Sequence, residues 1–448
     1  MKKNLRYPIY YISVGLCCLV LCLTAGLLAG FQYVVPTFIK QLLPFTALRP
    51  LHTLFALSWI FMGSIGSILW YIQNDTRYRY QSFSIIKLQF WLFLLTGLAI
   101  TVCYVLRKFE GKEYLEFPHL FYFPILLGWL LLAIYYFRAM WTSFASWPAY
   151  YWMWGTGMVF MIFHFTEAHM WILSYFKQDY IQNLTMQWKA GGAYVGAWNM
   201  LVYGCSMYVM EKTSGSGAYS RSKTAFFFYF LSLVNAMFNW AHHVYPVPNA
   251  EWIRYAAYLI SMTEWIILIR MIYLWKTNLP TAVKKKYRIA YKVMMLSDLW
   301  IFLNLVLALL ISIPAINLFT HGTHITVAHS MGTTIGINTL ILLSSVAYLQ
   351  ESLKMYSAKD RHLILVLLKV FNISFLGFWL VLIVMGIEKS KWLYFTQNVL
   401  FSDFQDSMKY FHIGFACFGI GLLAGLGGIA FRMLKHNWDI LKDSTENE

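Results

Sequence analysis

Apolar runs of roughly 20 residues recur along the whole chain, and a run of that length can carry a helix across a bilayer. Of the 448 residues, 59% are hydrophobic and only 12% are charged, whereas a soluble domain carries about 25% charged residues. The sequence therefore predicts an all-α, polytopic membrane protein with a single domain, residues 1–448, and about twelve membrane-spanning helices. Their approximate centres are Leu21, Ile60, Leu92, Leu127, Val159, Leu201, Leu231, Ile260, Val306, Ile337, Leu376 and Ala424.

The net charge of +16 fits a membrane protein better than a nucleic-acid-binding protein. Basic residues gather on the cytoplasmic side of membrane proteins, and here they cluster at alternate ends of the apolar runs. If the runs alternate in direction, all clusters lie on one side, and both termini are cytoplasmic. We expect an integral protein of a bacterial cytoplasmic (inner) membrane, with membrane lipid and no nucleic acid among its partners. The clusters comprise Lys2, Lys3, Arg6, Arg77, Arg79, Lys212, Arg221, Lys223, Lys284, Lys285, Lys286, Arg288, Lys354, Lys359, Arg361, Arg432 and Lys435.

Two adjacent histidines, His242 and His243, lie late in the seventh run, and His329 opens the tenth. Imidazoles inside a membrane are costly unless they bind something. A histidine pair on one helix and a lone histidine on another can hold a metal opposite a heme iron, which is the arrangement of a redox enzyme. The alternative is structural, because a buried histidine also hydrogen-bonds to neighbouring helices.

Other ionisable side chains also fall inside or beside the apolar runs, and each is a candidate functional residue. His164 and Glu167 in the fifth run are three residues apart and share a helix face, a spacing that binds metals in helical bundles. A hydrogen-bonded polar cluster is the other interpretation of this pair. The remaining candidates are His52, His169, Glu264, Asp298, His321, His324 and His412.

The six cysteines indicate neither disulfides nor covalent heme. All of them lie within apolar runs, and none belongs to a Cys-x-x-Cys-His heme attachment or a zinc pattern. Any heme is therefore held non-covalently. The six are Cys17, Cys18, Cys22, Cys103, Cys205 and Cys417.

Several ordered segments together resemble subunit I of the heme-copper oxidase superfamily, and within it the large, catalytic subunit of respiratory nitric oxide reductase. The similarity covers nearly the full length. It includes Arg49-Pro-Leu-His52-Thr in the second run and Gly111-Lys-Glu-Tyr-Leu-Glu116 between the third and fourth. It continues with His242-His243, Glu264 and the stretch Thr320-His-Gly-Thr-His-Ile-Thr-Val-Ala-His329.

The resemblance implies a twelve-helix fold and a membrane respiratory enzyme that reduces nitric oxide to nitrous oxide. It implies a low-spin heme b on His52 and a high-spin heme b on His329. His242 and His243 would bind a non-heme iron or copper, and Glu113 and Glu116 a structural calcium ion. Glu264 would relay protons. Electrons would come from a cytochrome c-type subunit or from quinol.

The stretch His329-Ser330-Met331 departs from the family pattern His-Gly-His, whose second histidine binds the low-spin heme. A methionine thioether can also ligate heme iron, and His/Met ligation raises the reduction potential. His52 with Met331 is therefore a candidate low-spin pair. Methionine is also a common filler of gaps in apolar cores, so Met331 packing without ligation remains the alternative.

The sixth run departs further, because the family carries a histidine ligand there, followed four residues later by a glutamate. Gly196 and Met200 line up with these two positions, and the run contains neither a histidine nor an acidic residue. His164 and Glu167 of the fifth run resemble the missing pair displaced by one helix. We therefore expect His164 as an additional metal ligand and Glu167 as a catalytic acid, with the hydrogen-bonded cluster as the alternative.

These departures leave other functions open beside nitric oxide reduction. One is a non-catalytic or altered heme protein, used in electron transfer or sensing, that descends from such a reductase. Another is a cytochrome c oxidase-type oxygen reductase. This function is disfavoured, because such oxidases carry a tyrosine cross-linked to a metal-binding histidine, and the usual arrangement in the sixth run cannot form here without a histidine in that run. A transporter is the least favoured, since the two halves show no repeat of broken helices.

Overall fold

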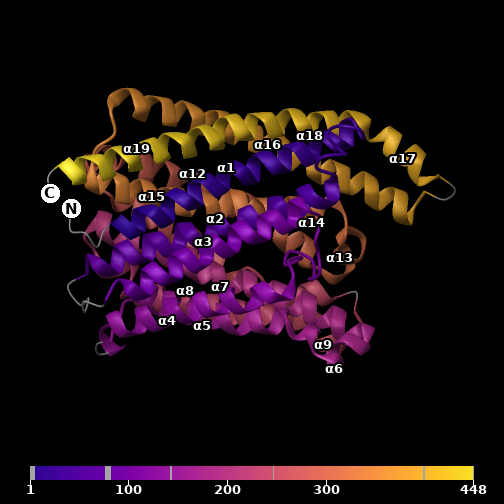
Figure 1. Ribbon diagram of the computed structural model, residues 1–448, viewed down its shortest axis with the longest axis horizontal. Coiled ribbons are helices and arrows are strands. Elements are labelled where there is room, and N and C mark those ends of the chain that lie inside the picture. The colour runs from indigo at the N-terminus through magenta and orange to yellow at the C-terminus, as the bar shows by residue number, and fades with distance from the viewer. Residues whose placement is uncertain (1–5, 76–81, 142–143, 246, 397–398, 447–448) are drawn as a thin grey trace.

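The computed structural model describes residues 6–75, 82–141, 144–245, 247–396 and 399–446. These residues are almost entirely helical, and their one β-type pairing is an isolated bridge between Lys112 and Leu115. Twelve helical segments run lengthwise through the bundle (Figure 1), which agrees with the predicted number and order. The first six are α1 (Arg6–Val34), α2 (Phe45–Gln73), α3 (Ser84–Val105), α4 (Tyr122–Ala139), α5 (Ala149–Ala168) and α7 (Tyr180–Ser214).

The other six segments include three that are interrupted along their length. The uninterrupted ones are α8 (Lys223–Phe238), α12 (Arg288–Ser312) and α16 (Ala358–Tyr394). The interrupted ones are α9 (Glu251–Ile260) with α10 (Thr263–Asn278); α14 (His324–Met331) with the π-helix η7 (Gly332–Thr339) and α15 (Leu340–Leu353); and α18 (Lys409–Leu422) with the π-helix η8 (Leu423–Gly427) and α19 (Gly428–Glu446).

Short helices occupy the connections between these segments. They are η2 (His119–Phe121), η3 (Phe144–Ser146), η4 (Met170–Ile172), α6 (Ser174–Gln178), η5 (Gly217–Tyr219), η6 (Asn239–Val244), α11 (Thr281–Lys286), α13 (Pro314–Thr320) and α17 (Phe401–Ser407).

Ten helical stretches of the described chain are long and apolar enough to cross a membrane. The exceptions among the twelve segments are α5 and α7, which carry His164, Glu167 and Lys189 in place of purely apolar residues. All six cysteines lie in helices as free thiols, as predicted.

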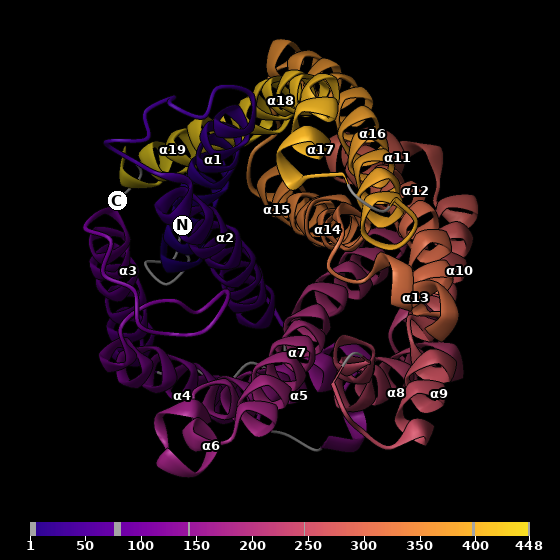
Figure 2. The ribbon, with the colours of Figure 1, turned by 90° about the vertical axis from the view of Figure 1, so that its right-hand side faces the viewer.

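Three segments form the centre of the bundle, and the others surround them (Figure 2). In the stretch 324–353, which contains α14, η7 and α15, 89% of the apolar window is buried, and in α2 the value is 72%. The other eight stretches bury only 28–44% of theirs, as expected for helices that face lipid. The third central segment is α7, whose side chains are almost all buried from Ala190 to Met210.

Polar side chains tie the central stretch 324–353 to its neighbours. Thr339 accepts a hydrogen bond from Nε1 of Trp59 on α2 over 3.0 Å. Asn338 donates to Asn199 on α7, also over 3.0 Å. Such bonds hold transmembrane helices together because the bilayer offers no water as an alternative partner. They fix the depth and rotation of the central stretch, and hence those of His329 at its outer part.

The start of α1 and the end of α19 lie at the same end of the bundle (Figure 1), as an even number of helical segments requires. That this end faces the cytoplasm stays a prediction. Four of the basic residues behind that prediction, Lys2, Lys3, Arg77 and Arg79, lie outside the described residues.

The pair α1 and α2 offers a test of the close packing. A Cβ added at Gly66 of α2 would lie 2.8 Å from both Cγ1 of Ile12 and the carbonyl oxygen of Pro8. We expect Gly66→Leu to lower the free energy of unfolding by about 1–3 kcal/mol, the usual cost of overpacking. The measurement is the thermal unfolding midpoint of the detergent-purified protein.

Gly97→Leu on α3 is the matched control, because no heavy atom lies within 4 Å of a Cβ added there. Leucine has a higher helix propensity than glycine, so this variant should be at least as stable as the original protein. Equal melting of the two variants would contradict the packing argument.

Candidate functional site

The paired histidines do not lie on a regular α-helix. His242 and His243 belong to the 3₁₀ turn η6, which follows the end of α8. Their ring centroids are 4.1 Å apart and the ring planes are inclined by 35°. Oγ of Ser261 lies 3.3 Å from Nδ1 of His242 and helps to fix the orientation of that ring. The two imidazoles are therefore close enough to share one metal ion.

The break between α9 and α10 brings further polar groups to this turn. Met262 adopts a left-handed backbone conformation (φ 62°), which is strained for a residue with a side chain. Asn235 of α8 stabilises the break, because its Oδ1 accepts from the Met262 amide at 3.1 Å and its Nδ2 donates to Thr263. Glu264 follows directly. It is buried in the bundle, as predicted, and its Oε2 has no hydrogen-bond partner among the residues that the structure describes.

His329 approaches the same region from α14. Its ring centroid lies 6.3 Å from that of Trp265, the neighbour of Glu264, and His329 is near enough to His243 for the two to interact electrostatically. Asn304 of α12 donates to the His329 carbonyl at 3.1 Å and holds this turn in place. Nδ1 of His329 is buried, and no hydrogen-bond partner for it lies within the described part of the chain. The predicted heme ligand and the predicted metal ligands therefore converge from different segments.

The face of α7 beside the histidine pair carries glycine. A Cβ added at Gly192 would lie 2.7 Å from Cδ2 of His243 and 2.9 Å from Cα of Trp240. A Cβ added at Gly196, one turn further on, would lie 2.7 Å from Cα of Ala236. The sequence comparison placed the missing histidine at Gly196, but the residue that faces His243 is Gly192. At both positions α7 packs too closely for any larger side chain.

The predicted pair on α5 exists, and a basic residue that the sequence analysis did not consider joins it. Nδ1 of His164 lies 3.0 Å from Oε2 of Glu167, so the imidazole donates to the carboxylate. The other carboxylate oxygen forms an ion pair with Lys189 of α7. The Lys189 ammonium also lies 5.8 Å from the ring centroid of Trp240, next to the histidine pair. Nε2 of His164 is buried without a partner and remains able to ligate.

The side chain of His52 is fixed against α1. Its Nδ1 donates to the carbonyl of Cys22 over 2.9 Å, and the Cys22 thiol lies 3.4 Å away. A Cβ at Gly26 would lie 2.7 Å from the same nitrogen, so glycine leaves the space that the ring needs. Since Nδ1 carries the proton, Nε2 at the opposite end of the ring keeps its lone pair for a metal.

Met331 lies at a depth similar to that of His52. Trp59 and Thr339 are hydrogen-bonded to each other, which sets a common level for α2 and the central stretch. His52 precedes Trp59 by seven residues, and Met331 precedes Thr339 by eight. Both segments run in the same direction in the alternating bundle. Seven residues of α-helix place His52 about 10 Å from that level at 1.5 Å per residue, and Met331 lies on the same side of it, at the start of the eight-residue π-helix η7. Met331 is partly buried against the core.

The predicted calcium ligands lie together outside the membrane-spanning helices and share one partner. Nη1 of Arg49 lies 3.2 Å from Glu113, and Nη2 lies 2.6 Å from Glu116. Burial raises the pKa of Glu116, while the charge of Arg49 opposes the rise. Oε2 of Glu116 is buried and has no partner among the described residues. The guanidinium bonds only Oε1 of each glutamate, so Oε2 of both carboxylates is left outside its bonds, and a cation would compete with Arg49 for the other two oxygens.

Three other candidates from the sequence lie apart from this centre. His169 donates to its own helix at the carbonyl of Phe165 over 2.8 Å. The ring centroids of His412 and Tyr33 are 5.2 Å apart and the ring planes are inclined by 34°. Asp298 interacts electrostatically with Lys276. Across the described ranges, no three histidine, cysteine or acidic side chains already stand at metal-binding distance.

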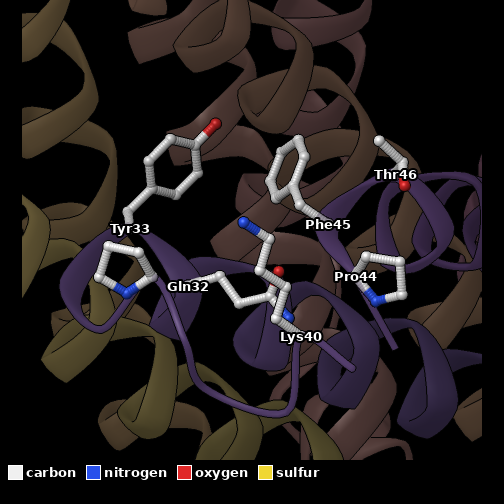
Figure 3. Close-up of a pocket in the computed structure, with 7 residues that line it drawn as sticks. Gln32, Tyr33, Lys40, Pro44, Phe45 and Thr46 are labelled. Carbon is white, nitrogen blue, oxygen red and sulfur yellow. The ribbon is translucent and has the colours of Figure 1, made fainter. Parts of the chain in front are cut away.

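A surface pocket of about 370 Å³ lies away from these groups, at the connection between α1 and α2 (Figure 3). The Lys40 side chain extends towards the rings of Tyr33 and Phe45 there. Gln32 orders the connection by donating to the carbonyls of Phe38 and Leu43. The pocket contains none of the histidines discussed above, so it does not belong to the candidate site.

The ion pair between α5 and α7 yields a stability test. Lys189→Met would leave the buried Glu167 carboxylate without its counter-ion. We expect a loss of about 1–3 kcal/mol, below the usual value for a fully buried pair because Lys189 is partly exposed. Thermal unfolding of the purified protein measures the effect.

The double variant Lys189→Met/Glu167→Gln should regain most of the loss, because it removes the uncompensated charge. Additive effects of the two substitutions would show that the ion pair does not stabilise the contact between α5 and α7.

Comparisons with known proteins agree with this arrangement. Residues 6–424 match the family described as cytochrome c and quinol oxidase polypeptide I. A nitric oxide reductase subunit of Stutzerimonas stutzeri is 21% identical over 389 residues, covering 80% of this chain and 77% of that protein. The structure of a heme-copper terminal oxidase dimer superposes with a TM-score of 0.71 at 12% identity, covering 98% of this chain and 84% of that one. The chain therefore belongs to the heme-copper oxidase subunit I family.

Proposed function

We propose that the protein reduces nitric oxide to nitrous oxide in a bacterial inner membrane. Two molecules of nitric oxide, two electrons and two protons give one nitrous oxide and one water. The convergence of His329 from α14 with His242 and His243 from η6 carries the proposal. The similarity to a nitric oxide reductase subunit favours this substrate within the family.

His329 is the proposed ligand of the high-spin heme b. A heme iron with one axial imidazole keeps an open face that can bind nitric oxide. Nδ1 of His329 makes no hydrogen bond among the described residues, so no protein hydrogen bond opposes rotation of the ring towards a metal. Asn304 fixes the backbone of this residue from α12. The non-heme iron or copper would be held by His242 and His243.

His52 and Met331 are the proposed ligands of the low-spin heme b. The Cys22 carbonyl orients His52 so that Nε2 is free, the usual arrangement for a metal-binding imidazole. Met331 lies at a matching depth and would give the heme a raised reduction potential. Electrons would enter from a cytochrome c-type subunit or from quinol and pass through this heme.

Glu264 and Glu167 are the proposed proton-transfer groups. Glu264 is buried beside Trp265, which in turn neighbours His329, and one of its oxygens has no partner. Glu167 is held between Lys189 and His164, one helix away from η6. His164 keeps a free Nε2 and is an additional candidate for the metal. A calcium ion at Glu113 and Glu116 would use carboxylate oxygens, its preferred ligands.

A second function is favoured by the glycine face of α7. Gly192 and Gly196 leave no room for the histidine and glutamate that complete the site in the family. A chain that binds heme without the second metal would serve electron transfer or sensing. Oxygen reduction is the other alternative, since a solved structure with a similar fold is that of a terminal oxidase.

His329→Ala tests the proposed function. The variant should lose at least about 10³-fold in nitric oxide consumption, because the substrate-binding heme would lose its protein ligand. The assay uses the purified protein with a chemical electron donor and an electrode selective for nitric oxide. His169→Gln is the control, because His169 is buried at the end of α5 and its ring donates to the carbonyl of Phe165, one turn earlier in the same helix.

Unchanged turnover in His329→Ala would sink the proposal. Heme and metal analysis of the same samples separates the alternatives. Two hemes with one carbon monoxide-reactive heme and one further metal support the reductase. Heme without the second metal, and without turnover, supports electron transfer or sensing. Turnover of oxygen but not of nitric oxide supports an oxidase.

Gly26→Val tests the role of His52. The added side chain would collide with the ring at Nδ1 and displace the imidazole from the Cys22 carbonyl. We expect loss of the low-spin heme signal and retention of the carbon monoxide-reactive one, measured by reduced and carbon monoxide difference spectra. Gly97→Val, in open space on α3, should keep both signals. A full low-spin signal in Gly26→Val would exclude His52 in this orientation as a heme ligand.

A further inference from the structure

The paired histidines need a further ligand, and the adjoining face of α7 does not provide it. Gly192 packs directly against His243, and Gly196 packs directly against Ala236, so neither position has room for a larger side chain. Two imidazoles alone bind a metal weakly and define its geometry poorly. If the pair holds a metal, as the proposed function requires, the missing ligand must come from another element.

His321 lies over the same face of α7 as the pair. It sits in the connection between α13 and α14, and its ring centroid is 5.3 Å from that of Trp188, with an interplanar angle of 40°. Trp188 precedes Gly192 by four residues, so the two share one face of α7, one turn apart. His321 therefore lies about one turn outward of His243. The two histidines are near enough to interact electrostatically.

The imidazole of His321 contacts the ring of Trp188. It makes no hydrogen bond or ion pair within the ranges that the structure describes. The next residue, Gly322, has a left-handed backbone (φ 72°), and nothing lies within 4 Å of a Cβ added there. The Gly322 carbonyl accepts an exposed hydrogen bond from Nζ of Lys389 at 3.0 Å, so a shift of the connection towards η6 would break that bond.

The pair on α5 is less suited to complete the site. Glu167 is neutralised by Lys189, and the ammonium lies on the side of Trp240 and the histidine pair. A metal dication shared between α5 and η6 would face this fixed positive charge. His243 interacts electrostatically with His329 and His321.

We propose that His321 completes a three-imidazole site with His242 and His243 for a divalent first-row metal ion. Neutral imidazole suits iron, copper and zinc alike. Because the three rings are not yet gathered at ligand distance among the described residues, metal binding draws the connection that holds His321 towards η6. The third ligand thus comes from beyond α13 and replaces the histidine that α7 lacks.

Metal titration of the full-length, detergent-purified protein tests the inference. His321→Gln should weaken binding of the non-heme metal by more than about tenfold, since losing even an outer partner of a metal-binding imidazole costs 10–100-fold. Iron, copper and zinc per chain are measured by elemental analysis, after subtraction of heme iron. Heme content should stay unchanged.

His324→Gln is the matched control. His324 is three residues away, but its electrostatic neighbours are Lys389 and His412 on α16 and α18, not the histidine pair. This variant should bind the metal as the original protein does. X-ray absorption of the unmodified protein gives a measurement that depends on no variant: three imidazole nitrogens at the non-heme metal are expected.

Metal affinity unchanged in His321→Gln would overturn the inference, as would only two imidazoles by X-ray absorption. Loss of metal in His164→Gln instead would assign the third ligand to α5. An original protein without a non-heme metal under titration would also overturn it. A three-imidazole metal without nitric oxide consumption would refute the proposed function while leaving the inference intact.

Discussion

The fold depends on hydrogen bonds between side chains of different helices, because the bilayer offers no water as an alternative partner. The central stretch 324–353 forms such bonds to α2 and α7 through Thr339 and Asn338. Asn304 of α12 adds a bond to the carbonyl of His329. These bonds connect the central stretch to α2, α7 and α12. They fix the position of His329, and therefore that of the candidate site.

Glycine provides the space for the imidazoles. Gly26 admits the ring of His52 between α1 and α2, and Gly192 admits His243 against α7. At both places a single methyl group would collide with the ring. Glycine at position 26 thus leaves space for His52, a proposed heme ligand. Glycine at position 192 lets α7 pack so closely against His243 that no metal ligand fits there.

In both places where acidic residues suggested metal binding, a basic side chain of the protein already forms an ion pair with them. Arg49 bridges Glu113 and Glu116, and Lys189 contacts Glu167. A fixed cation already neutralises much of the negative charge that would attract a free metal ion. The imidazole of His243 forms no such ion pair in the described part of the chain. His242, His243 and their neighbours are therefore the more favourable place for a metal ion.

The sequence by itself determined the class of fold, because run lengths and low charge leave few alternatives to a helical membrane bundle. It also supplied the order of the histidines along the chain, and the three-residue spacing of His164 and Glu167 correctly predicted their contact. Only the tertiary structure decided which side chains meet. Lys189 was visible as a charge in an apolar region, but its pairing with Glu167 depends on how α5 and α7 pack. The position of His321 above Gly192 depends on the course of the connection after α13. Helical periodicity describes one segment at a time, whereas the site is made of contacts between segments far apart in the chain.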